Sequence, residues 1–411
     1  MVFLRDTILN KLQSNPVAQQ MLQFGNNIGN LFPNEEALCM ASAFMQDKQT
    51  RIVVKKNRYE AQQLYQRLKP LINDTLLFVM EESLRVQAIA SSPEDKQEQL
   101  YVLTQLVKED KPRIIICNTA AFLRYLPDKE LFKSLCFKFE VDQEITMAEL
   151  KQKLNRAGYT KVNYVDRPCT YASRGGIVDV YCLEYEHPIR IEFFDTVIES
   201  IRLFHEETQR TIQTIDSVLI NPATDLLFTD DQIEYLQKEI DSELEKQQAK
   251  LIQDDYDFLL DFIEKDKISI ENYDIDPHLY IYFSYLNANK LTDYVNGHII
   301  FSSQEEVESG YKKLNEETIS FIQEMVESHQ YLPKYSMFHD IFTFEKEHTI
   351  QMFHDFLDFK HPIFSKIETL EKSDQPLIQI LENLKRENIY ISLDEEHTKK
   401  SAGSLKSLFN S

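Results

Sequence analysis

The sequence predicts an α/β protein that combines a parallel-sheet domain with a small β-rich α+β part. Two observations predict the α/β class. In residues 1–128 short apolar strands alternate with helical patterns, as in βαβ units. Residues 174–210 instead alternate apolar and polar side chains with period two, as in strands with two distinct faces. A chain of 411 residues has room for about two to four domains.

The first domain is read from its hydrophobic spacing. Ala61, Leu64 and Leu68 recur at helical intervals, whereas residues 51–55 and 113–117 are short β-branched or apolar runs. The expected elements, in order, are a helix at 35–46, a strand at 51–55, a helix at 58–68, a strand at 76–80, a helix at 96–107 and a strand at 113–117. A helix at 146–157 then opens the β-rich stretch, which runs to about residue 219.

Three strands are expected within the β-rich stretch, at 176–183, 189–194 and 200–204. The middle strand places Ile189, Ile191 and Phe193 on one face, which we expect to be buried. Its other, outer face carries Arg190, Glu192 and Phe194. An aromatic ring among charges on a polar face indicates a contact surface.

After Pro222 the sequence becomes helical and acidic. Residues 230–253 read as one long charged helix with Ile233, Leu236, Ile240 and Leu244 facing inward. A strand at 298–302 and a helix at 305–330 follow, and the aromatic-rich segment 332–362 has no clear assignment. Beyond a linker at 372–376 we expect a helix at 377–385, a strand at 388–393 and a helix at 397–409, the truncated start of another small α/β domain. The chain is therefore expected to be a fragment of a longer protein.

Composition narrows the functional class. A net charge of −22 repels phosphate backbones, so tight DNA binding by this chain alone is not expected. One basic stretch, residues 151–176, is either a solvated face or a docking patch for an acidic protein surface, and charge alone favours the first. The five scattered cysteines predict reduced thiols. The lack of a membrane-spanning run or a signal peptide predicts a cytoplasmic protein without membrane contact.

The β-rich stretch resembles the family of bacterial transcription-repair coupling factors and, more distantly, the excision-repair protein UvrB. The carrying residues are Arg174-Gly175-Gly176-Ile177-Val178-Asp179-Val180-Tyr181, Pro188-Ile189-Arg190-Ile191-Glu192-Phe193-Phe194-Asp195, Glu199-Ser200-Ile201-Arg202-Leu203-Phe204 and Thr208-Gln209-Arg210. Weaker agreement occurs at 59–65 and 88–94, and the similarity covers about residues 20–360.

The resemblance implies a domain plan and a function. A degenerate helicase-like (RecA or P-loop) domain would comprise residues 1–128 and 214–362, the inserted domain 129–213, and the linker and truncated next domain 363–411. It implies that the insert recruits UvrA to stalled RNA polymerase for transcription-coupled nucleotide excision repair. RNA polymerase and DNA would be bound through other domains of the full-length protein, and ATP and Mg only by its motor domains.

Carried over by motif position, the expected UvrA contacts are Arg174, Arg190 and Phe194, with Glu192 and Asp195 beside them. Arginine and aromatic residues dominate interface energetics, which agrees with this assignment. The alternative is that Phe194 packs inward at a bulge and Arg190 merely pairs with Glu192 or Asp195. One departure from the family is Cys169, which stands in place of a common Gly and leaves the shape of that turn open.

A nucleotide site needs glycines, a Lys for the phosphates and a Ser or Thr for magnesium. The candidate loop, residues 25–31, lacks the Lys and the hydroxyl, and the next helix opens with Glu35 and Glu36, which repel phosphates. The candidate magnesium strand, 299–301, is followed by Ser302 rather than an acid. We therefore expect no nucleotide hydrolysis, no cofactor and no catalytic residue in this chain.

Three hypotheses remain open at this stage. The first is a binding module that recruits UvrA through Arg174, Arg190 and Phe194. The second is an ATP-driven DNA translocase, against which the missing Lys argues. The third is a regulatory module that packs on the C-terminal part of the full-length protein, masks the UvrA surface and restrains the motor until a competing ligand shifts the equilibrium.

Overall fold

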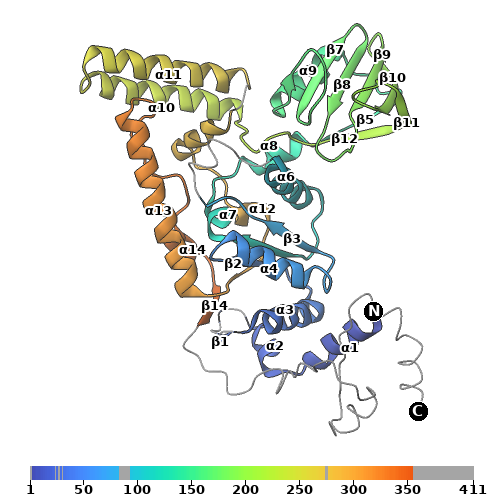
Figure 1. The fold of residues 1–411 in the computed structure, drawn as a ribbon, viewed down its shortest axis with the longest axis vertical. Helices are drawn as coiled ribbons and strands as arrows, with labels where there is room; N and C mark the ends of the chain where they lie inside the picture. Colours follow the sequence, from blue (N-terminus) through green and yellow to red (C-terminus); the bar gives the residue numbers. More distant parts are fainter. Residues whose placement is uncertain are drawn as a thin grey trace, which may run out of the picture. The chain divides into compact units, whose positions relative to one another are not determined.

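The computed structural model describes residues 2–23, 25, 28–29, 31–82, 93–273 and 276–354 (Figure 1). Within them the chain forms a parallel sheet with surrounding helices and a separate β-rich part. The α/β class and the β-rich unit expected from the sequence are confirmed. The elements expected in residues 363–411 lie outside the described residues.

The parallel sheet has six strands in the order β1-β14-β13-β2-β4-β3. Their bounds are β1 Ile28–Gly29, β14 Ile350–His354, β13 His298–Phe301, β2 Arg51–Lys55, β4 Ile114–Asn118 and β3 Thr75–Phe78. Every neighbouring pair is parallel. This parallel pairing agrees with the βαβ units that the alternation of strands and helices predicts.

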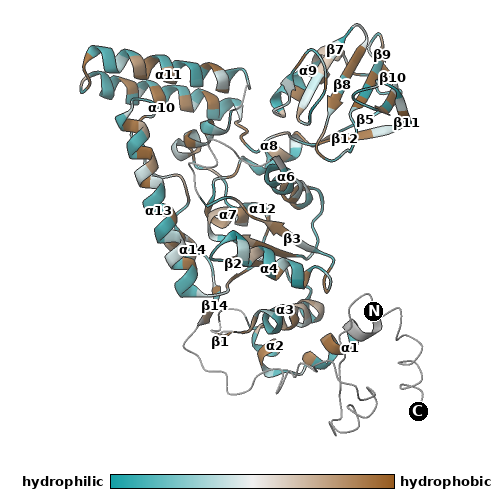
Figure 2. Cartoon of the chain, viewed as in Figure 1, coloured by the Kyte–Doolittle hydropathy of each residue, from teal (hydrophilic) through white to brown (hydrophobic). Residues whose placement is uncertain are grey.

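Helices and strands of this sheet follow their local sequence closely. β2 and α4 (Arg58–Leu68) have the bounds expected from the sequence. Asn57 fixes the start of α4, because its side-chain oxygen accepts a hydrogen bond from the Glu60 amide at 2.9 Å. The other helices of this part are α3 Pro33–Asp47, α6 Pro93–Lys108, α7 Thr119–Leu123, α8 Lys129–Ser134, α12 Leu291–Tyr294 and α13 Gln304–Glu327. In Figure 2, α13 mixes teal with brown, as expected for a helix with one buried face.

The β-rich part contains a second six-stranded sheet in the order β11-β10-β9-β8-β7-β6. Its strands are β6 Thr160–Lys161, β7 Thr170–Arg174, β8 Ile177–Tyr181, β9 Ile189–Phe194, β10 Val197–Phe204 and β11 Thr211–Ile215. β9 has the expected bounds, β8 lies within the expected 176–183, and β10 begins three residues earlier than expected. Helix α9, Met147–Arg156, contributes Leu150 and Leu154 to the core.

The pairing of two strands bears on where the insert ends. Residue 213, its expected end, falls inside β11. The next strand, β12 (Ser217–Ile220), pairs antiparallel with β5 (Phe137–Glu140). Because paired strands fold together, we propose that the insert extends at least to Ile220.

The acidic segment differs from the single helix expected at 230–253. Helix α10 ends at Gln248, and a second helix, α11, runs from Gln253 to Glu271. The predicted inward residues of α10, Ile233, Leu236, Ile240 and Leu244, are all buried. In α11, acidic residues stand between Leu259, Ile263 and Ile270 and obscure the helical spacing of these three in the sequence. The three apolar residues are buried as well.

Several elements were missed from the sequence. β14 and α14 (Ile341–Glu347) lie in the unassigned segment 332–362, and β14 fills the central sheet between β1 and β13. The remaining helices are α1 Val2–Leu12, α2 Pro16–Gln20 and the 3-10 helix η1 Pro277–Tyr285. Among the described residues no helix has the length and apolar character that a membrane span requires.

Candidate protein-interaction site

The turn between β7 and β8 positions the first candidate contact. Arg174 ends β7, and Gly175 follows with φ +56°, which glycine adopts at little cost. Gly176 lies against β9: its carbonyl accepts a hydrogen bond from the Phe193 amide at 2.8 Å, and a Cβ on it would come 2.9 Å from the Phe193 carbonyl oxygen. The two glycines therefore let this turn press on β9 while the Arg174 side chain stays exposed.

β9 separates a buried face from an exposed one, as its sequence predicts. Ile189 and Ile191 are fully buried, and Phe193 is 9% exposed. The next residue, Phe194, is 74% exposed. This exposure leaves the Phe194 ring accessible to a partner, as the predicted contact requires. The alternative in which Phe194 packs inward is wrong.

Arg190 is bound within its own sheet. It lies directly opposite Asp179 in the β8–β9 pair. Its Nε and Nη2 donate to the two Asp179 carboxylate oxygens at 2.7 and 2.8 Å, and Nη2 also donates to Gln209 at 2.7 Å. The guanidinium stands 4.3 Å from the ring centre of Phe204. The hydrogen bonds that Arg190 donates to the Asp179 carboxylate are the main cause that raises the Arg190 pKa. Neither Glu192 nor Asp195, the partners considered from the sequence, pairs with it.

The charge of Glu192 is also paired within the sheet. The side chain of Arg202 on β10 forms an ion pair with it, and the Ser200 hydroxyl donates to it at 2.8 Å. Asp195 behaves differently: it stands in the turn between β9 and β10 with φ +57° and is exposed. Two buried or half-buried ion pairs thus occupy the middle of the outer face of β7–β10.

The five expected site residues therefore fall into two groups. Arg174, Phe194 and Asp195 are exposed, at the ends of strands that pair in sequence from β7 to β10. Arg190 and Glu192 are held by intramolecular partners. Sequence reasoning missed Asp179 and Arg202. Asp179 lies opposite Arg190 in the strand register, whereas Arg202 lies opposite Arg190 on β10 and reaches Glu192 diagonally.

The turn at Cys169 forms without the glycine that is common in the family at this position. Cys169 has φ +62°, a left-handed conformation that glycine adopts readily and other residues adopt at a cost. Its amide donates to the Tyr181 carbonyl at 2.8 Å, and its carbonyl accepts from Thr160 at 3.0 Å. The turn thus has a glycine-like conformation although it carries a cysteine. Burial raises the pKa of the Cys169 thiol.

The carboxyl end of the parallel sheet contains a carboxylate where a nucleotide domain would bind phosphate. Glu36, in the first turns of α3, is buried, and its two carboxylate oxygens accept from the Lys55 ammonium at 2.8 and 3.1 Å. The Ser302 hydroxyl, just after β13, donates to the same carboxylate at 2.6 Å. Glu36 and Ser302, which follow the two segments considered as nucleotide-binding candidates, thus bond to each other.

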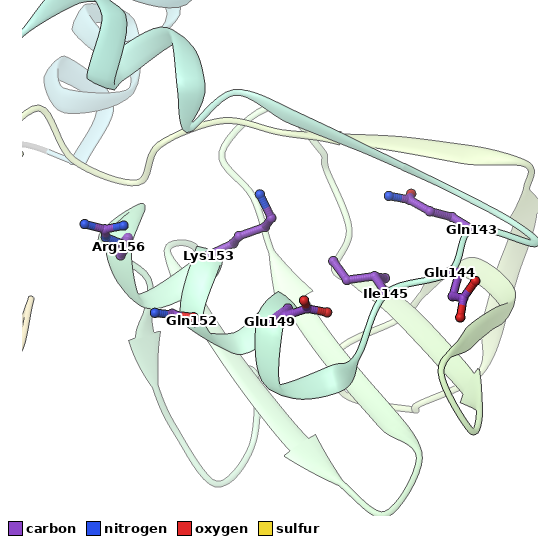
Figure 3. Close-up of a pocket in the computed structure, with 7 residues that line it drawn as sticks. All are labelled: Gln143, Glu144, Ile145, Glu149, Gln152, Lys153 and Arg156. Carbon is purple, nitrogen blue, oxygen red and sulfur yellow. The ribbon is translucent and has the colours of Figure 1, made fainter.

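A hollow of about 340 Å³ lies beside α9 (Figure 3). Gln143 and Glu144 line it from the loop before the helix, and Glu149, Lys153 and Arg156 from the helix itself. Glu149 bonds to Thr146 in a capping box, and Arg156 pairs with Asp230, so these charges already have partners. Within the described residues no group of three or more His, Cys, Asp or Glu could hold a metal.

Comparison with known proteins places the β-rich part in context. Residues 137–226 match the family model of the UvrB interaction domain. The chain is 31% identical over 304 residues to a transcription-repair-coupling factor of Bacillus subtilis strain 168, covering 72% of this chain and 25% of that protein. The factor of Staphylococcus haemolyticus is 28% identical over 305 residues, covering 72% and 26%. The chain thus spans about a quarter of the length of these curated relatives.

Proposed function

This chain is similar to the UvrB-like module of bacterial transcription-repair-coupling factors and contains a UvrB interaction domain, and from this premise we propose that it recruits UvrA in transcription-coupled excision repair. The observation that carries the proposal is the exposed Phe194 ring, flanked by the exposed Arg174 and Asp195. Large aromatic and arginine side chains supply most of the binding energy at protein interfaces.

The two ion pairs give this surface its shape. Asp179–Arg190 and Glu192–Arg202 hold the side chains of β8, β9 and β10 in one arrangement before a partner binds. A pre-ordered surface loses less side-chain entropy on binding. Phe194 and Arg174 are the proposed direct contacts, whereas Arg190 holds the face in position through its pairing with Asp179.

The proposal is tested with the purified chain and UvrA in calorimetry. Phe194→Ala is expected to weaken binding by at least tenfold, about 1.4 kcal/mol, because a large aromatic contact is lost. Arg174→Ala is expected to weaken it as well. Phe32→Ala is the matched control, since Phe32 is also 74% exposed but stands at the N-cap of α3 in the parallel-sheet domain.

Two outcomes would separate the possibilities. Equal UvrA affinity of wild type, Phe194→Ala and Arg174→Ala would remove this face from the proposed function. An equal loss in Phe32→Ala would show that any exposed aromatic matters, and would remove the specific assignment.

We also propose that the chain does not hydrolyse ATP. Glu36 supports this proposal, because a buried carboxylate bonded to Lys55 and Ser302 repels a phosphate group at that place. Calorimetric titration with ATP and magnesium is expected to give no binding heat. Measurable binding with turnover would instead favour the translocase hypothesis.

The regulatory hypothesis uses the same surface. In a longer protein, the Phe194 face could be covered by another part of the polypeptide, and UvrA would then compete for it. Its test is the ATPase rate of the full-length protein with and without this module. An unchanged rate would remove the restraint on the motor from the proposal.

A further inference from the structure

The proposed UvrA contacts lie at one end of the outer face of β7–β10. Phe194 ends β9, and Arg190 lies four residues before it on the same strand, about 13 Å away. A specific protein interface covers about 800 Å² and about 20–30 residues on each partner. An interface of that size has room for a second anchor beyond Arg190.

Tyr164 adjoins Arg190 and is exposed. It lies in the segment between β6 and β7 and is 41% exposed. The Arg190 Nη2 donates to Gln209 Oε1 at 2.7 Å, and Gln209 Nε2 donates to the Tyr164 hydroxyl at 2.9 Å. One side-chain amide thus links the two residues, so an aromatic ring stands beside Arg190 at the end of β9 away from Phe194.

The Tyr164 hydroxyl is held on both sides. It accepts the hydrogen bond from Gln209 and donates one to the Glu206 backbone carbonyl. Tyrosine has only two rotatable side-chain bonds, and these hydrogen bonds fix its direction, so a partner that covers the ring costs little further side-chain entropy. Because the hydroxyl is already bound, Tyr164 offers ring surface to a partner. The group that fits such a surface is an apolar side chain.

Gln209 holds the ring in this position. Its backbone has φ +60°, a left-handed conformation that glycine adopts freely and that most other residues adopt at a cost. Its amide bonds to Arg190 and Tyr164 and also donates to the Glu206 carbonyl at 2.8 Å. A shorter side chain would suit the backbone better, but it would not span from Arg190 to Tyr164. The unfavourable conformation is therefore maintained by the side-chain contacts of Gln209.

We propose that Tyr164 is a second aromatic contact for UvrA, on which an apolar UvrA side chain packs, and that Gln209 is its positioning residue. This inference rests on the proposed function, because it extends the surface that contains Phe194. The two ion pairs of the outer face then lie between two aromatic anchors, Phe194 at one end and Tyr164 at the other.

The test is calorimetric titration of UvrA with the whole chain and its variants. Tyr164→Ala is expected to weaken binding at least tenfold, because the ring is lost. Tyr164→Phe keeps the ring and is expected to bind UvrA more tightly than Tyr164→Ala. Tyr235→Ala is the matched control, since Tyr235 is 47% exposed but belongs to α10, and it is expected to bind as wild type does.

Urea unfolding of each variant shows whether the fold is retained. Tyr164 is exposed, so its replacement is not expected to unfold the chain. Tyr164→Gln, which keeps a long polar side chain without a ring, is the second variant should Tyr164→Ala prove unstable, and the same loss of UvrA affinity is expected from it.

A double-mutant cycle tests the role of Gln209. Gln209→Gly removes the amide and suits the left-handed backbone, so the turn is expected to be retained. It is expected to weaken UvrA binding, and most of that loss is expected to disappear when Tyr164 is already alanine. Such non-additivity identifies a residue that acts through Tyr164, which a general loss of stability would not produce.

The outcomes separate this inference from the proposed function. Wild-type affinity in Tyr164→Ala, together with weakened binding in Phe194→Ala, would overturn the second contact and leave the proposed function standing. Equal losses in Tyr164→Ala and Tyr235→Ala would also overturn it. Additive losses in the cycle would remove Gln209 as the positioning residue. A wild-type chain that does not bind UvrA would overturn both proposals.

Discussion

Arg190 and Asp179 face each other across the β8–β9 pair and share two parallel hydrogen bonds, of 2.7 and 2.8 Å. Asp179 is buried, whereas Arg190 retains partial exposure. The pair therefore couples the stability of the β-rich sheet to the surface proposed to bind UvrA.

Removing one member of this pair is expected to destabilise the chain. Arg190→Ala leaves the buried Asp179 carboxylate without its partner, and we expect a loss of about 2–4 kcal/mol in the free energy of unfolding. Arg190→Lys is expected to recover only part of this, because an ammonium group cannot make the bidentate contact. Urea unfolding of the two variants checks the prediction. A Lys variant as stable as wild type would show that charge alone matters.

Phe193 and Phe194 are adjacent but should respond in opposite ways. Phe193→Ala removes a buried ring and is expected to cost about 3 kcal/mol of stability. Phe194→Ala removes an exposed ring and is expected to change stability by less than about 0.5 kcal/mol. Thermal unfolding of both variants distinguishes the two faces of β9. A large loss in Phe194→Ala would mean that its ring supports the fold.

Because the backbone at Cys169 is left-handed, we expect glycine to give a more stable protein than alanine at this position. Both substitutions remove the thiol, but only glycine relieves the cost of φ +62°. Cys169→Gly is therefore expected to be about 1 kcal/mol more stable than Cys169→Ala in urea unfolding. If alanine is the more stable of the two, the turn does not store this conformational cost.

Glu36 is expected to stabilise the carboxyl end of the parallel sheet. Glu36→Ala leaves the Lys55 ammonium without its carboxylate, and we expect a loss of about 2–4 kcal/mol in the free energy of unfolding. Glu36→Gln keeps an oxygen that can accept from Ser302 and is expected to lose less. Chemical unfolding measures both. Equal losses would indicate that the Ser302 contact contributes nothing.

His278 should make stability depend on pH. Burial disfavours its charged form, but the hydrogen bond and charge of Asp266, together with the nearby Asp276, outweigh burial and raise the His278 pKa above 6.5. Tyr282 donates to the second Asp266 oxygen at 2.7 Å and holds that carboxylate in place. A pKa that is raised in the folded state stabilises the protein at low pH.

The contribution of His278 is therefore fully present below about pH 6.5 and is lost as the pH rises through the folded-state pKa. The stability difference between wild type and His278→Gln is expected to be larger at about pH 6 than at about pH 8. Urea unfolding at the two pH values checks this. A difference that grows with pH would contradict the raised pKa.

Much of the fold could be predicted because local signals agree with tertiary structure there. The bounds of β2 and α4 follow from a β-branched run and from apolar residues at helical spacing. β14 could not be predicted, because its sequence, Ile-Gln-Met-Phe-His, becomes a strand only by pairing with β1 and β13, which are distant in sequence. α11 was missed for a related reason. Its apolar residues are separated by acids in the sequence and become buried only when the helix packs against other elements.

For the candidate site, the sequence by itself determined that β9 has an apolar face and a face with Arg190, Glu192 and Phe194, because strand side chains alternate with period two. Only the tertiary structure decided which of these side chains remain available. Strand pairing brings Asp179 against Arg190 and Arg202 against Glu192, and leaves Phe194 in solvent. Those partners come from neighbouring strands, and only the register sets which residues lie opposite one another.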